Sequence, residues 1–146
     1  MNVDVTVETE VSSSVRARQV QASFDVPERK KQRLEWHLEM PIEAREWKVG
    51  LIVGPSGSGK STVMRHVFGA EKPIEWQAKS VIDDFDSKLT VAAITEACGA
   101  VGFNTIPAWL RPHAVLSNGE KFRVELARRL LEEAAPVVID EFTSLV

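Results

Sequence analysis

Valine and polar residues alternate near the start of the chain. Over residues 3–7 this period of two predicts a half-buried strand. The ranges 15–24 and 36–40 show the same alternation, and they predict two further strands joined by charged, proline-containing turns. We therefore expect residues 1–47 to form a small antiparallel β layer.

Later segments change to continuous apolar runs and to helical spacing. The runs at 49–53 and 137–141 predict strands that are buried on both faces, as in a parallel sheet. Residues 61–68 predict a short helix ended by a glycine, and residues 91–98 predict a second helix capped by Thr90. The middle of the chain thus predicts an α/β core.

The longest predicted helix follows Ser117, and Glu120 stands at the spacing of a capping box. Its apolar residues form a broad stripe, with Phe122, Leu126 and Leu130 on one line and Val124, Ala127 and Leu131 beside it. The remaining ranges predict short strands near 74–76 and 81–82 and an irregular stretch over 103–113.

Composition places the chain among ordinary single-domain globular proteins. It has 146 residues, of which 44% are apolar and 27% charged, and its net charge is −3. This charge does not support a nucleic-acid partner. The single cysteine, Cys98, excludes an internal disulfide and favours a reduced, cytoplasmic setting. We find neither a transmembrane segment nor a secretory signal in the sequence.

A glycine-rich loop lies between the 49–53 strand and the 61–68 helix. It fits the pattern G-x-x-x-x-G-K-[ST] with Gly54, Pro55, Ser56, Gly57, Ser58, Gly59, Lys60 and Ser61. Such a loop turns its N–H groups inward to phosphate, and the following helix N-terminus adds partial positive charge. We expect Lys60 to reach the β- and γ-phosphates and the Ser61 hydroxyl to bind Mg²⁺. The alternative is a glycine-rich turn that matches by chance.

Acidic residues follow two of the apolar segments. Asp140 ends the C-terminal apolar run, where phosphate-loop ATPases place an acid that completes the Mg²⁺ site, and Glu141 is then placed to polarise water. Acids also end strands without any catalytic role, so this assignment depends on the glycine-rich loop. The group Asp83, Asp84 and Asp86 either binds a metal or belongs to a solvated loop; we favour the loop, because metal sites need more convergent ligands.

Together these motifs resemble the nucleotide-binding domain of ABC-class (ATP-binding cassette) ATPases. Gly54 to Thr62, GPSGSGKST, resembles the Walker A motif of that family. Leu116 to Glu120, LSNGE, resembles its LSGGQ signature, and residues 137–141, VVIDE, resemble Walker B with its catalytic glutamate. Phe24 lies where the family usually places an aromatic residue that stacks on adenine, although it is equally suited to core packing. Phosphate-loop nucleotide kinases share only the first of these motifs.

The chain also departs from the family pattern. Asn118 and Glu120 replace a glycine and a glutamine of the signature, and the Q-loop glutamine is not evident, although Asp83 or Asp84 stands near its place. The chain stops at residues 143–146, which resemble the start of the D-loop, one residue before its usual aspartate. We therefore expect a naturally short protein or a fragment without the switch histidine.

For the fold, the resemblance implies one ATP-binding domain over 1–146. It would combine the antiparallel β layer with a phosphate-loop NTPase core over 48–146, which contains a parallel sheet and a helical subdomain reduced to about 83–115.

For function, the resemblance implies an ATP hydrolase with Lys60 and Glu141 as catalytic residues and Ser61 and Asp140 at Mg²⁺. ATP would lie between residues 54–62 of one copy and Ser117, Asn118, Gly119 and Glu120 of a second, in an ATP-dependent head-to-tail homodimer. Two alternatives remain: a nucleotide-dependent association switch with little hydrolysis, or an energising subunit of a transporter or DNA-repair-like complex. The sequence does not identify a protein partner.

Overall fold

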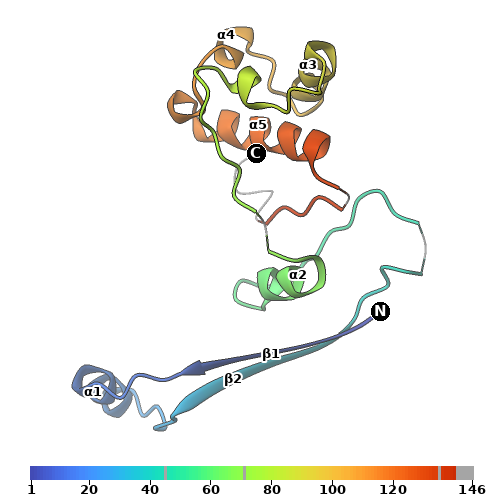
Figure 1. Cartoon of the computed structure of the whole chain (residues 1–146). Coiled ribbons are helices and arrows are strands. Elements are labelled where there is room, and N and C mark those ends of the chain that lie inside the picture. Colours follow the sequence, from blue (N-terminus) through green and yellow to red (C-terminus); the bar gives the residue numbers. More distant parts are fainter. Residues whose placement is uncertain (45, 71, 135, 141–146) are drawn as a thin grey trace. The chain divides into compact units, whose positions relative to one another are not determined.

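The computed structural model describes residues 1–44, 46–70, 72–134 and 136–140. The chain divides into two compact units, Met1–Gly69 and Ala70–Val146 (Figure 1). Each unit has its own cluster of buried apolar residues. The boundary falls after helix α2 (Lys60–Phe68), so the glycine-rich loop belongs to the same unit as the N-terminal strands.

The first unit is built on a two-stranded antiparallel sheet. Strand β1 (Asn2–Glu10) pairs with β2 (Lys31–Glu39), and Val5 lies opposite Trp36. Val3 and Val5 are buried, whereas the polar residues between and beside them are exposed. The strands predicted at 3–7 and 36–40 are therefore confirmed.

The strand predicted over 15–24 is wrong, because Val15–Ser23 forms helix α1. Ser14 caps this helix, its Oγ accepting a hydrogen bond from the N–H of Ala17 at 3.2 Å. Alanine, arginine and glutamine dominate the segment, and these residues favour helices. Its apolar residues do not form a buried row, since Phe24 at the C-cap is 75% exposed and none of α1 is buried.

Helix α2 packs on the sheet and ends as the sequence predicts. Val63 is buried against Val3 and Val5, and the partly buried side chains of Val7, Trp36, Met40 and Val67 surround this cluster. At the C-terminal end, the N–H of Gly69 donates to the carbonyl of Arg65 at 2.9 Å. The position of α2 fixes the loop that precedes it.

The expected parallel sheet is not formed by the described residues. The only strand pairing among them is β1 with β2, and no strand occurs over 49–53 or 136–140. Val49, Leu51 and Val53 are 77–88% exposed. A strand requires a neighbour that accepts and donates its backbone hydrogen bonds, and an apolar sequence alone does not supply one. The phosphate-loop NTPase fold class therefore stays a prediction.

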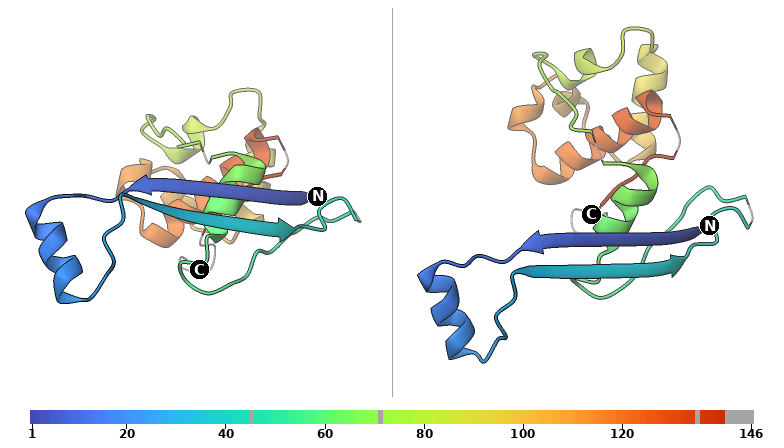
Figure 2. Two further views of the ribbon diagram at one scale, coloured as in Figure 1. Left: turned by 90° about the horizontal axis from the view of Figure 1, so that it is seen from below. Right: turned by 60° about the horizontal axis from the view of Figure 1, so that its bottom comes forward.

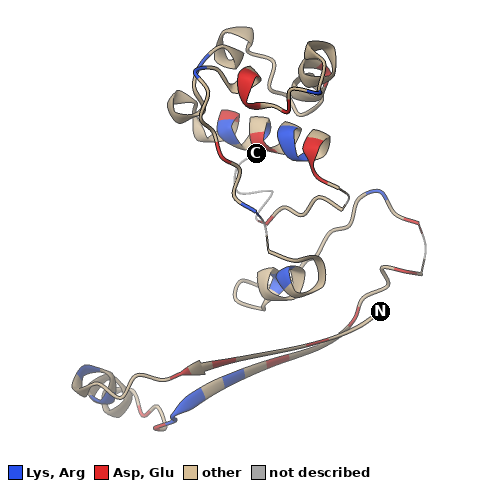
Figure 3. Cartoon of the chain, viewed as in Figure 1, with Lys and Arg blue, Asp and Glu red and all other residues tan. Residues whose placement is uncertain are grey.

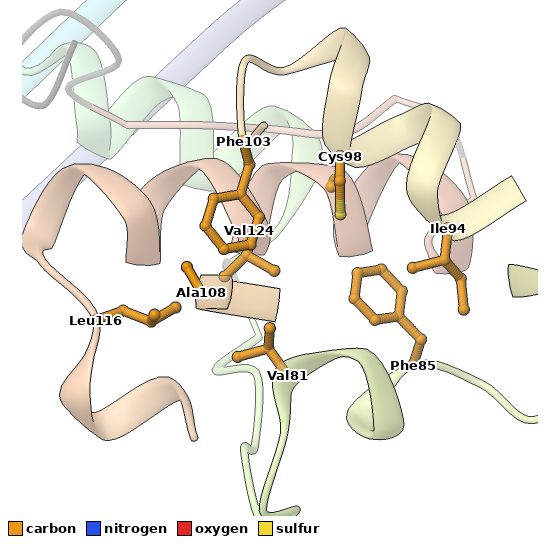
Figure 4. Packing of buried hydrophobic residues seen from close by; sticks show 9 residues of the cluster. Val81, Phe85, Ile94, Cys98, Phe103, Ala108, Leu116 and Val124 are labelled. Carbon is orange, nitrogen blue, oxygen red and sulfur yellow. The ribbon is translucent and has the colours of Figure 1, made fainter. Parts of the chain in front are cut away.

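The second unit is helical. It contains the 3₁₀ helices η1 (Val81–Asp84) and η2 (His113–Val115) and the helices α3 (Val91–Ala100), α4 (Ile106–Trp109) and α5 (Asn118–Glu132). Its core is shown in Figure 4 and consists of Val81, Phe85, Ile94, Cys98, Phe103, Ala108, Leu116, Val124 and Ala127. The helix predicted at 91–98 is confirmed with its Thr90 cap, whereas the short strands predicted near 74–76 and 81–82 are absent from the described residues.

Helix α5 is confirmed, but a different part of its apolar stripe is buried. Val124 and Ala127 are fully buried and Leu131 packs against the same core, whereas Leu130 is 55% exposed. Val124 and Ala127 belong to the core cluster that the helices of this unit share. Phe122 and Leu126 are half-buried.

A ring-stacking contact and contacts from two arginines connect the start of the second unit to the rest of that unit. The rings of Trp76 and His113 are parallel with centroids 4.5 Å apart, and the guanidinium of Arg128 lies 4.9 Å from the Trp76 ring. Arg128 and Arg129 of α5 donate to the carbonyls of Glu75 and Lys72, at 2.8 and 3.0 Å. The segment 72–77 is thus held without regular secondary structure.

Basic and acidic residues are interspersed along β2 and α5, whereas β1 carries acidic residues only (Figure 3). The paired strands of the sheet together therefore carry both signs. None of the described helices has the length and apolar character that a membrane crossing demands.

Candidate functional site

The backbone of the glycine-rich loop turns sharply and leads directly into α2. Gly57 and Gly59 have φ angles of 75° and 88°, in the left-handed region that glycine adopts readily. The N–H of Ser58 donates to the carbonyl of Pro55 at 3.3 Å, which closes the turn. Gly59 is the N-cap of α2 and offers no side-chain cap. The loop therefore presents its backbone at a helix N-terminus, the arrangement that favours an anion.

Lys60 closes the loop on itself. Its Nζ donates to the carbonyls of Gly54 and Pro55, at 2.9 Å each. These bonds bring the ammonium group back to the start of the loop from the first residue of α2. A cation held only by neutral carbonyls gains stronger, charge-assisted hydrogen bonds when phosphate oxygens replace them.

Trp36, on the neighbouring strand β2, contacts the other end of the loop. Its indole Nε1 donates to the carbonyl of Ser58 at 2.8 Å. The ring also lies against Gly59, where an added Cβ would be 2.4 Å from two indole atoms. The sequence predicts Trp36 only as a strand residue. A contact between a strand side chain and the loop backbone at Ser58 and Gly59 leaves no signal in residue spacing.

The remaining loop residues lie at the surface or in the first turn of α2. Ser61 and Thr62 are half-buried on α2, whereas Pro55, Ser56 and Ser58 are exposed. The Ser61 hydroxyl thus stands one residue after Lys60 at the helix N-terminus, where the motif places its Mg²⁺ ligand.

The second predicted metal ligand lies in the other unit. Asp140 is half-buried and follows the 136–139 segment, while Ser61 belongs to Met1–Gly69. Glu141, the predicted catalytic base, lies outside the described residues. Among the residues that are described, no group of three or more histidine, cysteine, aspartate or glutamate side chains is arranged to hold a metal ion.

The predicted signature segment forms a complete capping box at the start of α5. The N–H and Oγ of Ser117 donate to Glu120 Oε2 at 2.9 and 2.8 Å, and the Glu120 N–H donates to Ser117 Oγ at 3.3 Å. The bonds from Ser117 lower the pKa of the Glu120 carboxyl below its usual value. Asn118 and Gly119 form the first turn of α5. The acid that departs from the family pattern therefore has a structural role here.

Phe24 does not lie at the loop. It follows α1, which connects β1 to β2 beyond their Glu10 and Lys31 ends, whereas α2 packs on Val3 and Val5 near the start of β1 (Figure 2). Its exposure also excludes the alternative role in a core. The adenine-stacking assignment of Phe24 has no support in this arrangement, and Trp36 is the aromatic residue that contacts the loop.

The acidic group in the middle of the chain supports local turns. Asp84 Oδ1 accepts hydrogen bonds from the N–H groups of Gln77 and Ala78 at 2.9 and 3.0 Å. Asp83 accepts from the Ser80 hydroxyl at 2.5 Å, and Asp86 accepts from the N–H of Lys88 at 2.9 Å. Asp83 and Asp84 therefore lie in η1 and not in the predicted solvated loop, and the three carboxylates accept hydrogen bonds from nearby backbone N–H groups and from one hydroxyl.

No family model, curated protein or solved structure matches this chain.

Proposed function

We propose that the chain binds Mg-ATP through residues 54–62 and hydrolyses it to ADP and phosphate as an ATPase of the ABC type. The observation that carries the proposal is the loop itself. Two left-handed glycines and a lysine that folds over the loop stand directly at the N-terminus of a nine-residue helix. The phosphate-loop NTPase fold class is part of this proposal.

The groups of the proposed site match the chemistry of ATP and of Mg²⁺. Loop N–H groups and the Lys60 ammonium are donors, and phosphate oxygens accept from such groups. The Ser61 hydroxyl and the Asp140 carboxylate are hard oxygen ligands of the kind that Mg²⁺ prefers. Bound Mg²⁺ supplies neutralisation of charge on the phosphates.

The proposal assigns a separate role to each residue of the site. Lys60 exchanges the Gly54 and Pro55 carbonyls for phosphate oxygens, so that its charge is used for binding. Glu141 orients and polarises the attacking water. Ser117 to Glu120 of a second copy contact the γ-phosphate at the N-terminus of α5, which makes dimer formation dependent on ATP.

Binding is tested by calorimetric titration of Mg-ATP into the wild type, Lys60→Ala and Lys88→Ala. Lys88 is an exposed lysine outside the loop and serves as the charge-matched control. We expect Lys60→Ala alone to lose binding. Equal binding by all three proteins would refute the loop assignment.

Turnover and assembly are tested separately with Glu141→Gln. We expect phosphate release by the wild type only, and a shift from monomer to dimer in light scattering when Mg-ATP is added to Glu141→Gln. Binding and dimer formation without phosphate release in the wild type would replace hydrolysis by an ATP-dependent association switch.

A further inference from the structure

Trp36 is held rigidly where it meets the glycine-rich loop. It lies within β2, paired with Val5 of β1, and its ring packs at the edge of the cluster formed by Val3, Val5 and Val63. Strand pairing fixes its backbone, and the cluster restricts its side chain. The ring is therefore a fixed support beside a loop that has little side-chain packing of its own.

The indole fixes the orientation of one loop peptide. Its Nε1 donates to the carbonyl of Ser58 at 2.8 Å. In a trans peptide the C=O and the next N–H point in opposite directions, so the N–H of Gly59 points away from Trp36. That N–H is one of the donors that such loops turn toward phosphate.

The same contact limits the freedom of Gly59. Glycine has more conformational freedom to lose than other residues, and ordering a loop opposes binding. The ring lies so close to Gly59 that an added Cβ would be 2.4 Å from it. A peptide already held by Trp36 loses less entropy when phosphate arrives, which strengthens binding by pre-organisation.

We propose that Trp36 is a positioning residue that orients the Ser58–Gly59 peptide for phosphate binding. This inference rests on the proposed nucleotide site. It assigns Trp36 to the triphosphate and not to the base. A residue that stacks on adenine would instead strengthen the binding of ATP and leave inorganic tripolyphosphate unaffected.

The test compares Trp36→Phe with Trp47→Phe. Phenylalanine keeps an aromatic ring and removes the N–H donor. Trp47 is the matched control, because its Nε1 also donates to a backbone carbonyl, that of Ile42 at 2.9 Å, in the same unit but outside the loop. Calorimetry gives the Kd of each protein for Mg-ATP and for magnesium tripolyphosphate, and NMR gives the exchange rate of the Gly59 amide without ligand.

We expect Trp36→Phe to bind both ligands about threefold to tenfold more weakly, by the same factor, as the loss of one hydrogen bond predicts. Gly59 amide exchange should accelerate in this variant and stay unchanged in Trp47→Phe. If the wild type binds both ligands and the two variants have the same Kd values, the inference is overturned while the nucleotide site stands. A larger loss of affinity for ATP than for tripolyphosphate would place Trp36 at the base, and this result also overturns the inference. If the wild type binds neither ligand, the proposed function fails, and the role of Trp36 in phosphate binding fails with it.

Discussion

Alanine substitution at two glycines of the loop separates backbone strain from the contact with Trp36. Gly57 and Gly59 have similar φ angles, 75° and 88°. They differ in their surroundings. Among the described residues, nothing lies within 4 Å of a Cβ added at Gly57, whereas a Cβ at Gly59 would meet the Trp36 ring at 2.4 Å.

The two changes should therefore destabilise the first unit by different amounts. Placing alanine in the left-handed region costs about 1–2 kcal/mol, partly offset by roughly 0.4–1 kcal/mol because alanine restricts the unfolded chain. Gly57→Ala should thus cost about 1 kcal/mol. Gly59→Ala adds the cost of overpacking against a side chain held in the sheet, typically about 1–3 kcal/mol, so its total should be about 2–4 kcal/mol.

Hydrogen exchange read by mass spectrometry is the suitable assay, because it reports the opening free energy of α2 and β1 separately from that of the helical unit. Gly59→Ala should reduce protection across α2 more than Gly57→Ala does. Adding Trp36→Val should remove most of that difference. Equal losses of protection in the two single variants would refute the contact between the indole and Gly59.

Three further predictions concern the helical unit. Ser117→Ala should lower the free energy of unfolding by about 1 kcal/mol and Ser117→Gly by only about a few tenths, because alanine removes the cap whereas glycine tolerates its geometry. Urea titration followed by far-UV circular dichroism measures these values. A larger loss of stability for the glycine variant would contradict the capping role. Burial lowers the pKa of His113 below 6.5, so its contribution to stability is complete above that pH and is lost as the pH falls toward the lowered folded-state value. Between pH 8 and pH 5.5 the urea midpoint of the wild type should therefore fall more steeply than that of His113→Gln. Cys98 is buried, and burial raises its pKa to about 11, so a thiol reagent should label the native protein at least about tenfold more slowly than the urea-unfolded chain.

Features specified by neighbouring residues were predictable from the sequence. The capping box needs only Ser117 and Glu120 at the correct spacing, and the structure forms it. The turn of the loop needs glycine at Gly57 and Gly59, where left-handed angles occur. The alternation over 3–7 marks a strand with one buried face, as observed. In the capping box and the loop, the determining interaction lies within a few residues along the chain, whereas the alternation over 3–7 indicates only which side chains are buried once β2 and α2 pack on β1.

Features that depend on distant partners were not predictable in the same way. The segment 15–24 contains alternating apolar residues, yet its helix-favouring composition and the Ser14 cap produce α1, and the strands of the described residues pair only with each other. The run at 49–53 is apolar enough for a buried strand, but its side chains stay exposed where the described residues offer no neighbouring strand. Trp36 meets the loop only because β2 and α2 pack on the same part of β1.

The residues of the proposed site come from both units of the chain. The contacts that shape the loop come from Lys60, Pro55 and Trp36, all within the first unit. Asp140 belongs to the second unit, and the proposal assigns water activation to Glu141. In the proposal, the loop that binds phosphate and the residue that activates water therefore lie in different parts of the chain. Changes at Lys60 or Trp36 should act on affinity, and a change at Glu141 should act on the rate of hydrolysis while ATP still binds.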